Sequence, residues 1–110
     1  MQTVDNVLKA RMELHRANEE LEQDFERATG EKLSAVRILV LAALYHGAPM
    51  NATQLYELID VSNSALTYLM NRMESDGLVQ RERGKDDRRQ VLTYLTPYAS
   101  NLMQKFFDRR

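Results

Sequence analysis

The chain has 110 residues, of which 44% are apolar and 28% charged, with a formal net charge of −1 and no cysteine. This composition is typical of one globular domain with a single core. The absence of cysteine excludes disulfides, thiolate zinc sites and cysteine nucleophiles. The longest apolar run, Ile38–Leu44, is far shorter than the roughly 20 residues of a membrane-spanning helix. Because the N-terminus also lacks the pattern of a signal peptide, we expect a cytoplasmic protein.

Charge is distributed unevenly along the chain. Residues 1–32 hold five Lys or Arg against eight Asp or Glu, a net of −3, whereas residues 33–110 hold ten against eight, a net of +2. A local basic patch can bind phosphate even when the whole chain is nearly neutral. The net charge therefore does not exclude a nucleic-acid partner.

The first two predicted elements are helices. Residues 3–29 contain no proline and no internal glycine, and Gly30 supplies a C-terminal stop. Apolar residues recur there every seven positions, which favours partial packing against a second subunit; packing on the domain's own core is the alternative. Residues 33–46 are apolar nearly all round and predict a central buried helix. The expected dimerisation residues, including two from the chain's end, are Val4, Val7, Leu14, Leu21, Phe25, Leu102 and Phe106.

Two short helices separated by a tight turn come next. Asn51 and Gln54 have the spacing of a capping box at the start of the first helix. Residues 60–62 interrupt that helix, and Ser62 can cap a second one that ends at Gly77. A helix, a turn and a helix with a narrow apolar stripe indicate a helix-turn-helix unit. The stripe of the second helix consists of Leu66, Leu69, Met70 and Met73.

The pattern then changes to that of strands. Residues 78–83 and 90–95 are β-prone and are joined by a charged tip, which predicts a hairpin. Thr96–Pro97 supplies an N-cap and a first-turn proline for a last helix. Its aromatic residues suit a core or a subunit contact.

These elements together predict a mainly α winged helix-turn-helix fold. We expect about five helices and a two- to three-stranded antiparallel sheet within a single domain, residues 1–110. An N-terminal dimerisation helix would occupy residues 1–32, the winged helix-turn-helix core residues 33–96, and a short C-terminal helix residues 97–110.

No motif in the sequence indicates catalysis. There is no glycine-rich phosphate loop and no nucleophile elbow. His15 and His46 are the only imidazoles, and neither lies in a tight metal-ligand spacing. We therefore expect no enzymatic activity, no cofactor and no metal.

The second helix of the helix-turn-helix unit has an outward face rich in uncharged hydrogen-bonding groups. Such a face suits the edges of bases in a major groove, where amide and hydroxyl groups can pair with several bases. A merely solvated face is the alternative. The predicted reading residues are Ser62, Asn63, Ser64, Thr67, Tyr68, Asn71 and Arg72.

Basic side chains gather on the hairpin, where a guanidinium can bind phosphate or enter a narrow minor groove. Asp86 and Asp87 are expected to hold an arginine of the same loop in a fixed orientation through a bidentate contact. A solvated turn is the alternative here. The predicted DNA contacts of the wing are Arg81, Arg83, Lys85, Arg88 and Arg89.

Two strings carry a family resemblance. Residues 73–81, Met-Glu-Ser-Asp-Gly-Leu-Val-Gln-Arg, followed by Asp87–Arg88–Arg89 and Leu95–Thr96, resemble the winged-helix signature of the MarR family of bacterial transcription regulators. Residues 60–67 resemble that family's turn and the start of its recognition helix. The resemblance implies a homodimer that binds a pseudo-palindromic operator in double-stranded DNA, commonly as a repressor. It places the recognition helix in a major groove, with Arg88 or Arg89 in the adjacent minor groove.

The sequence departs from the family pattern after Thr96. Pro97–Tyr98–Ala99 stands where the family usually has a glycine, and fourteen residues follow Thr96 where two longer helices are usual. We expect the dimer to depend on residues 3–29 and the short terminal helix, as in SarA-like regulators. The resemblance also implies a small-molecule effector, although half of its usual cleft is expected to be absent.

The sequence thus predicts a sequence-specific, double-stranded DNA-binding transcription regulator without catalysis. The alternative is a winged-helix module that binds a protein partner and has no specific DNA binding. The nearly neutral net charge would agree with that alternative.

Overall fold

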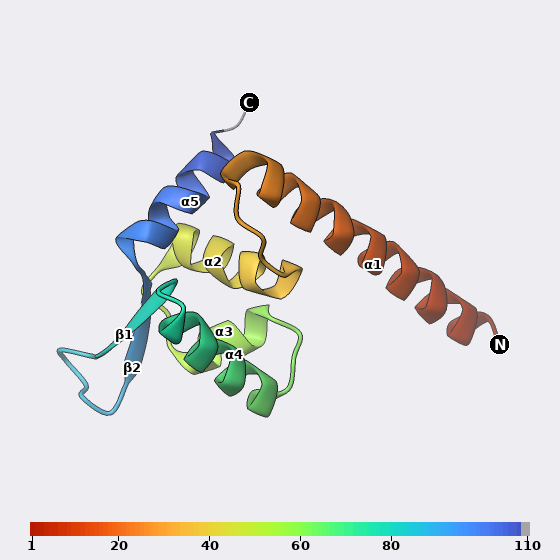
Figure 1. Ribbon diagram of the computed structural model, residues 1–110. Coiled ribbons are helices and arrows are strands. Elements are labelled where there is room, and N and C mark those ends of the chain that lie inside the picture. The colour runs from red at the N-terminus through yellow and green to blue at the C-terminus, as the bar shows by residue number, and fades with distance from the viewer. Residues whose placement is uncertain (109–110) are drawn as a thin grey trace.

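The computed structural model describes residues 1–108, which form five helices and a two-stranded sheet (Figure 1). This architecture confirms the predicted winged helix-turn-helix fold. The predicted boundaries agree with the observed ones to within one or two residues, except that the last helix, predicted over 97–110, ends at Phe107, and residues 109–110 lie outside the described residues. The elements are α1 (Gln2–Thr29), α2 (Ala35–Gly47), α3 (Ala52–Leu58), α4 (Asn63–Ser75), β1 (Val79–Arg83), β2 (Val91–Leu95) and α5 (Pro97–Phe107).

Short polar side chains mark where the helices begin. Ser34, Ser62 and Thr96 each accept a hydrogen bond from the backbone N–H three residues further on. Asn51 and Gln54 form a reciprocal capping box, with side-chain to backbone distances of 2.8 and 2.9 Å. Each of these bonds satisfies a backbone N–H that the helix leaves without an internal partner. The helix boundaries are therefore encoded locally.

The wing is an antiparallel hairpin in which Val79 lies opposite Leu95 and Arg83 lies opposite Val91. The segment before α3 adds one bridge to it. Met50 donates its N–H to the Thr93 carbonyl at 3.2 Å and accepts from the Thr93 N–H at 2.7 Å. This bridge fixes the start of α3 against the base of the wing.

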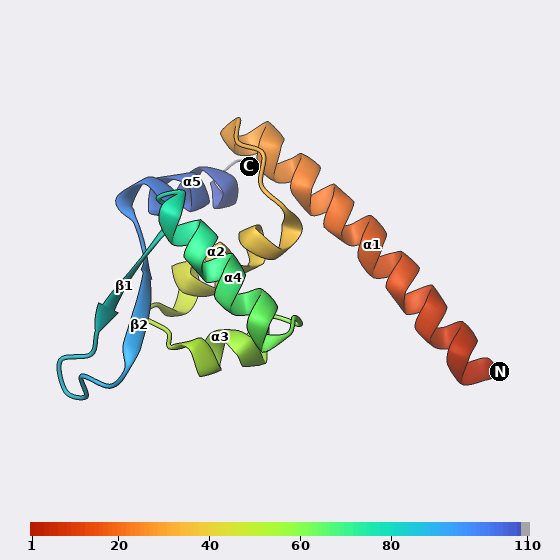
Figure 2. The same ribbon diagram turned by 60° about the horizontal axis from the view of Figure 1, so that its bottom comes forward.

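Helix α2 forms the centre of the molecule, between α5 on one side and α3 and α4 on the other (Figures 1 and 2). Such a helix has apolar neighbours around most of its circumference, as its composition predicts. The largest fully buried side chains of the core are Phe25, Ile38, Val40, Leu41, Leu44, Leu55, Met73, Val79 and Met103.

Helix α1 joins this core only through its C-terminal part. The Phe25 ring lies 5.3 Å from the Phe106 ring, measured between centroids. A Glu22 carboxylate oxygen accepts a hydrogen bond of 2.7 Å from the Ala35 backbone N–H. The last turns of α1 are thus attached to both α5 and α2.

The structure corrects part of the expected dimerisation set. Phe25, Leu102 and Phe106 are 0%, 5% and 8% exposed, and they pack in this chain's own core. The apolar period that suits a partner subunit also suits packing of α1 on α5, and the fold uses it for the latter at these positions. We therefore leave these three residues out of the interface proposed below.

The N-terminal part of α1 projects away from the rest of the molecule (Figures 1 and 2). Val4, Val7 and Leu14 on this part are 57%, 49% and 59% exposed. Along the same stripe, Leu21 is partly buried against the core. One apolar stripe therefore begins in the core and continues onto an uncovered helix. Among the described residues, no helix is long and apolar enough to cross a membrane.

Candidate nucleic-acid interface

Helix α4 is buried along one side and exposed along the other. Its inward side chains, Leu66, Met70 and Met73, belong to the core. The centre of the outward face carries four exposed and uncharged residues spaced i, i+3, i+4 and i+7, which places them on one side of a helix. They are Ser64, Thr67, Tyr68 and Asn71.

The three other predicted reading residues lie around this face. Ser62 is the N-cap of α4, and its hydroxyl oxygen accepts from the Ala65 N–H at 3.1 Å. Asn63 lies beside a hollow next to α3, and Arg72 is exposed on the last turns. Ser62 is thus engaged in starting the helix.

Arg81 crosses from β1 to α4. Its guanidinium donates to the Glu74 carboxylate at 2.6 Å and to Asn71 Oδ1 at 2.7 Å. These bonds hold the pKa of Glu74 below its usual range, because the hydrogen bond and charge of Arg81 favour the carboxylate. We expected Arg81 among the DNA contacts of the wing; the structure instead places its guanidinium between the wing and α4.

A second arginine braces the wing loop. The Arg83 guanidinium donates to the Arg88 carbonyl oxygen at 2.8 Å. The Gly84 N–H donates to the Gln90 carbonyl at 2.9 Å, and a Cβ on Gly84 would lie 2.7 Å from the Asp87 carbonyl oxygen. The loop therefore closes tightly where glycine leaves room for it.

The tip of the wing exposes basic side chains. Asp87 accepts hydrogen bonds from Arg89 through both carboxylate oxygens, at 3.1 and 3.4 Å. The Arg89 bonds lower the pKa of Asp87, and the Arg89 side chain is still 92% exposed. Lys85 and Arg88 are exposed as well. In the described part of the chain, Asp86 makes no such contact with an arginine, so the orienting carboxylate is that of Asp87.

The exposed face of α4 and the wing are therefore linked through Arg81. Comparison with known proteins identifies the family of the chain. The family model described as "MarR family" matches residues 33–91. This range covers more than half of the chain and extends from just before α2 to the first residue of β2. The chain belongs to the MarR family.

Two relatives of known sequence are named as transcriptional regulators. The chain is 31% identical over 84 residues to the uncharacterized HTH-type transcriptional regulator YdgJ of Bacillus subtilis, a match that covers 76% of this chain and 50% of that protein. It is 31% identical over 70 residues to the organic hydroperoxide resistance transcriptional regulator of the same organism, covering 64% of this chain and 48% of that one. The chain thus spans about half the length of the curated relatives it matches.

The fold also resembles that of solved MarR-type structures. A crystal structure of a mutant MarR from E. coli complexed with operator DNA superimposes with a TM-score of 0.70 at 21% identity, over 93% of this chain and 74% of that one. At this level of identity the likeness concerns the fold alone.

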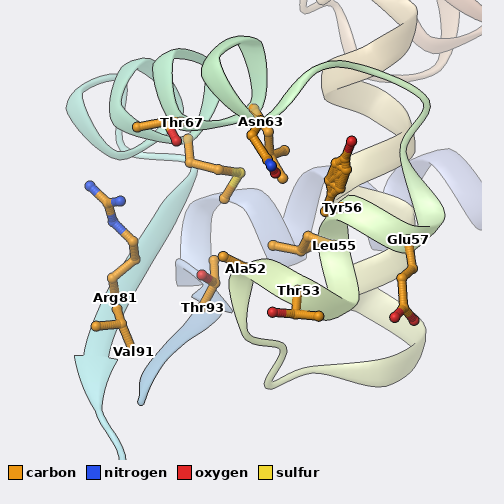
Figure 3. Close-up of a pocket in the computed structure, with 12 residues that line it drawn as sticks. Ala52, Thr53, Leu55, Tyr56, Glu57, Asn63, Thr67, Arg81, Val91 and Thr93 are labelled. Atoms are coloured by element: carbon orange, nitrogen blue, oxygen red, sulfur yellow. The ribbon is translucent and has the colours of Figure 1, made fainter. Parts of the chain in front are cut away.

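A hollow of about 520 Å³ lies between α3, α4 and the base of the wing (Figure 3). In the close-up, Arg81 extends from the strand toward α4, on whose side Thr67 and Asn63 lie. The hollow thus lies next to the exposed face of α4 in this MarR-family domain. Its lining residues are Ala52, Thr53, Leu55, Tyr56, Glu57, Asn63, Leu66, Thr67, Met70, Arg81, Val91 and Thr93.

Two further residues that position α4 were not among those predicted from the sequence. Glu74 accepts from Arg81, and Asp76 accepts from the Arg37 guanidinium of α2 at 2.9 Å. A signal for the first was present, because Glu74 lies three residues after Asn71, on the same side of the helix. Glu74, near the end of α4, and Arg81, in the middle of β1, lie on either side of the Gly77 turn, a spacing that favours their contact.

Proposed function

We propose that this chain is a sequence-specific, double-stranded DNA-binding transcription regulator that acts as a homodimeric repressor on a pseudo-palindromic operator in the cytoplasm. One observation carries the proposal. The uncharged, hydrogen-bonding face of α4 lies beside an arginine-bearing wing, and Arg81 bonds join the two. Sequence-specific DNA binding requires both kinds of group, because contacts to base edges read the sequence and contacts to the DNA phosphates position the protein.

The face of α4 supplies the base-reading part. A major groove about 12 Å wide admits one helix. The hydroxyl groups of Ser64 and Thr67 both donate and accept hydrogen bonds, and the Thr67 methyl suits the thymine methyl. Because these side chains are exposed, α4 can enter the groove without rearranging the core.

The wing supplies the backbone and minor-groove part. Asp87 restricts the Arg89 side chain, so less conformational entropy is lost when its guanidinium binds. Arg88 is exposed next to it. A guanidinium on such a loop can bind phosphate or enter a narrow minor groove.

The uncovered stripe of α1 supports a second copy of the chain as the partner. Val4, Val7 and Leu14 leave apolar area in water along a helix that projects from the domain. Isolated helical segments gain little stability in water, and an apolar stripe with a seven-residue period suits an equivalent helix. The same stripes on two copies would cover each other.

The dimer is tested by two charge substitutions at adjacent positions of α1. Leu14→Lys places a charge on the apolar stripe, whereas Glu13→Lys, the matched control, places it outside the stripe. We expect sedimentation equilibrium to show a dimer for the wild type and Glu13→Lys and a larger monomer fraction for Leu14→Lys. A wild-type monomer at micromolar concentration would contradict the dimer.

DNA binding is tested by fluorescence anisotropy on labelled duplexes over a range of salt concentrations. Arg89→Ala should weaken binding to all duplexes similarly and lower the salt slope by about one, as expected for one lost phosphate contact. Thr67→Ala should instead reduce the ratio of specific to random-sequence binding. If the wild type binds no duplex at low salt, the proposal is overturned in favour of a protein-interaction module.

A further inference from the structure

The contact between Arg81 and Asn71 determines how Asn71 can read a base. A guanidinium has only donors, so the atom that it meets at 2.7 Å must be the Asn71 carbonyl oxygen, as the structure has it. The two polar groups of an amide diverge from one carbon atom. Binding of Oδ1 to the wing side therefore turns the amino group, Nδ2, away from Arg81.

Asn71 is the last of the four residues on the exposed face of α4. It shares this face with Ser64, Thr67 and Tyr68, and all four are exposed. An amino group turned away from the wing at this place is directed along the surface that would meet the groove. One of the two lone pairs of the oxygen that would accept from adenine N6 is already engaged by Arg81, and this bond fixes the orientation of the amide.

Arg81 is itself fixed. The Glu74 carboxylate oxygen accepts from two guanidinium nitrogens of Arg81, at 3.2 and 2.6 Å. The Arg81 side chain is 29% exposed, so protein surrounds most of it. Two side chains of α4 and one of β1 thus form a connected unit that restrains the Asn71 amide.

We propose that Arg81 is a positioning residue that orients the Asn71 amide so that its amino group, not its oxygen, meets the base, which selects guanine over adenine at that position. Guanine presents two acceptors, O6 and N7, in the major groove, whereas adenine presents N7 beside the N6 donor. An amino group presented in this way suits the two acceptors of guanine and meets the N6 donor of adenine. This inference rests on the proposed function, because it specifies how the proposed recognition helix reads DNA.

The test selects bound duplexes from a random pool with the wild type and three variants, and then measures affinities for sites that differ by guanine or adenine at one position. For the wild type we expect a preference for guanine of about fivefold or more, the lower range for a two-bond contact. Arg81→Met frees Asn71 Oδ1, so the preference should fall to about one or shift to adenine. Asn71→Asp removes the donor and should abolish the preference for guanine.

Arg83→Met is the matched control, because the same substitution is made two residues further along β1, where the guanidinium bonds to the wing loop. It should lower the affinity for all sequences and leave the ratio of guanine to adenine binding unchanged. Thermal unfolding followed by circular dichroism shows whether each variant folds. Should Arg81→Met not fold, Glu74→Gln loosens the same unit and should reduce the same ratio.

Two results would overturn the inference, and they differ. If the wild type enriches a sequence and Arg81→Met lowers its affinity uniformly with an unchanged base preference, Arg81 is a phosphate contact and the positioning role is wrong. If the wild type enriches no sequence at all, the proposed function fails and this inference fails with it.

Discussion

Replacing Phe25 with alanine tests whether α1 is anchored to the domain by this one buried ring. The side chain is 0% exposed, and the centroid of its ring lies 5.3 Å from that of the Phe106 ring. Removal of a fully buried phenylalanine costs about 3–5 kcal/mol in free energy of unfolding. A domain of 110 residues has an unfolding entropy of about 0.23 kcal/mol/K, so the midpoint should fall by about 13–22 °C.

The assay is denaturant and thermal unfolding at one fixed protein concentration, since association also contributes to stability. Phe107→Ala is the matched control, because Phe107 is 37% exposed and lies at the surface against the Tyr45 and His46 rings. It should cost about 1–2 kcal/mol, in proportion to its smaller buried area. A loss below about 1.5 kcal/mol for Phe25→Ala, or equal losses for the two variants, would refute the anchoring of α1 through this ring.

Three further predictions concern α4 and the wing. Ser62→Ala removes the N-cap bond of α4 and should lower the free energy of unfolding by about 1 kcal/mol in urea titrations; no change would show that the cap is dispensable. Gly84→Ala brings a Cβ within 2.7 Å of the Asp87 carbonyl oxygen. It should cost about 1–3 kcal/mol and weaken binding to every duplex, whereas wild-type values for both would contradict the tight loop. Because Arg81 lowers the pKa of Glu74, the stabilisation from this contact is complete above the ordinary glutamate pKa of about 4.3 and is lost as the pH falls through the lowered value. Glu74→Gln should therefore give a shallower acid decline of stability, and an unchanged decline would argue against the contact.

The sequence predicts the order and type of the elements well because their signals are local. Ser34, Asn51, Ser62 and Thr96 cap the helices that the structure contains, and Gly30 ends α1 with a φ of 78°. Such signals act over three or four residues and do not depend on how distant segments pack. The change of period after Gly77 likewise identifies the strands without tertiary information.

Features that depend on distant contacts could not be predicted in the same way. The periodicity of α1 is equally compatible with a partner helix and with α5, so the sequence alone did not place Phe25 against Phe106. A cluster of arginines on a hairpin also does not tell which of them face the solvent. Arg81 turns to α4 because strand pairing places β1 beside that helix, whereas Arg89, whose contact with Asp87 is local, stays 92% exposed.

Selection of bound duplexes from a random DNA pool with the wild-type chain tests most directly whether the chain recognises a DNA sequence as a dimer. We expect an enriched inverted repeat whose half-sites lie about 10 to 10.5 base pairs apart, or a multiple of that distance, because a two-fold dimer presents two copies of α4 to one side of the duplex. A single unrepeated half-site would contradict the dimer. The absence of any enriched sequence, together with no binding at low salt, would contradict DNA recognition itself.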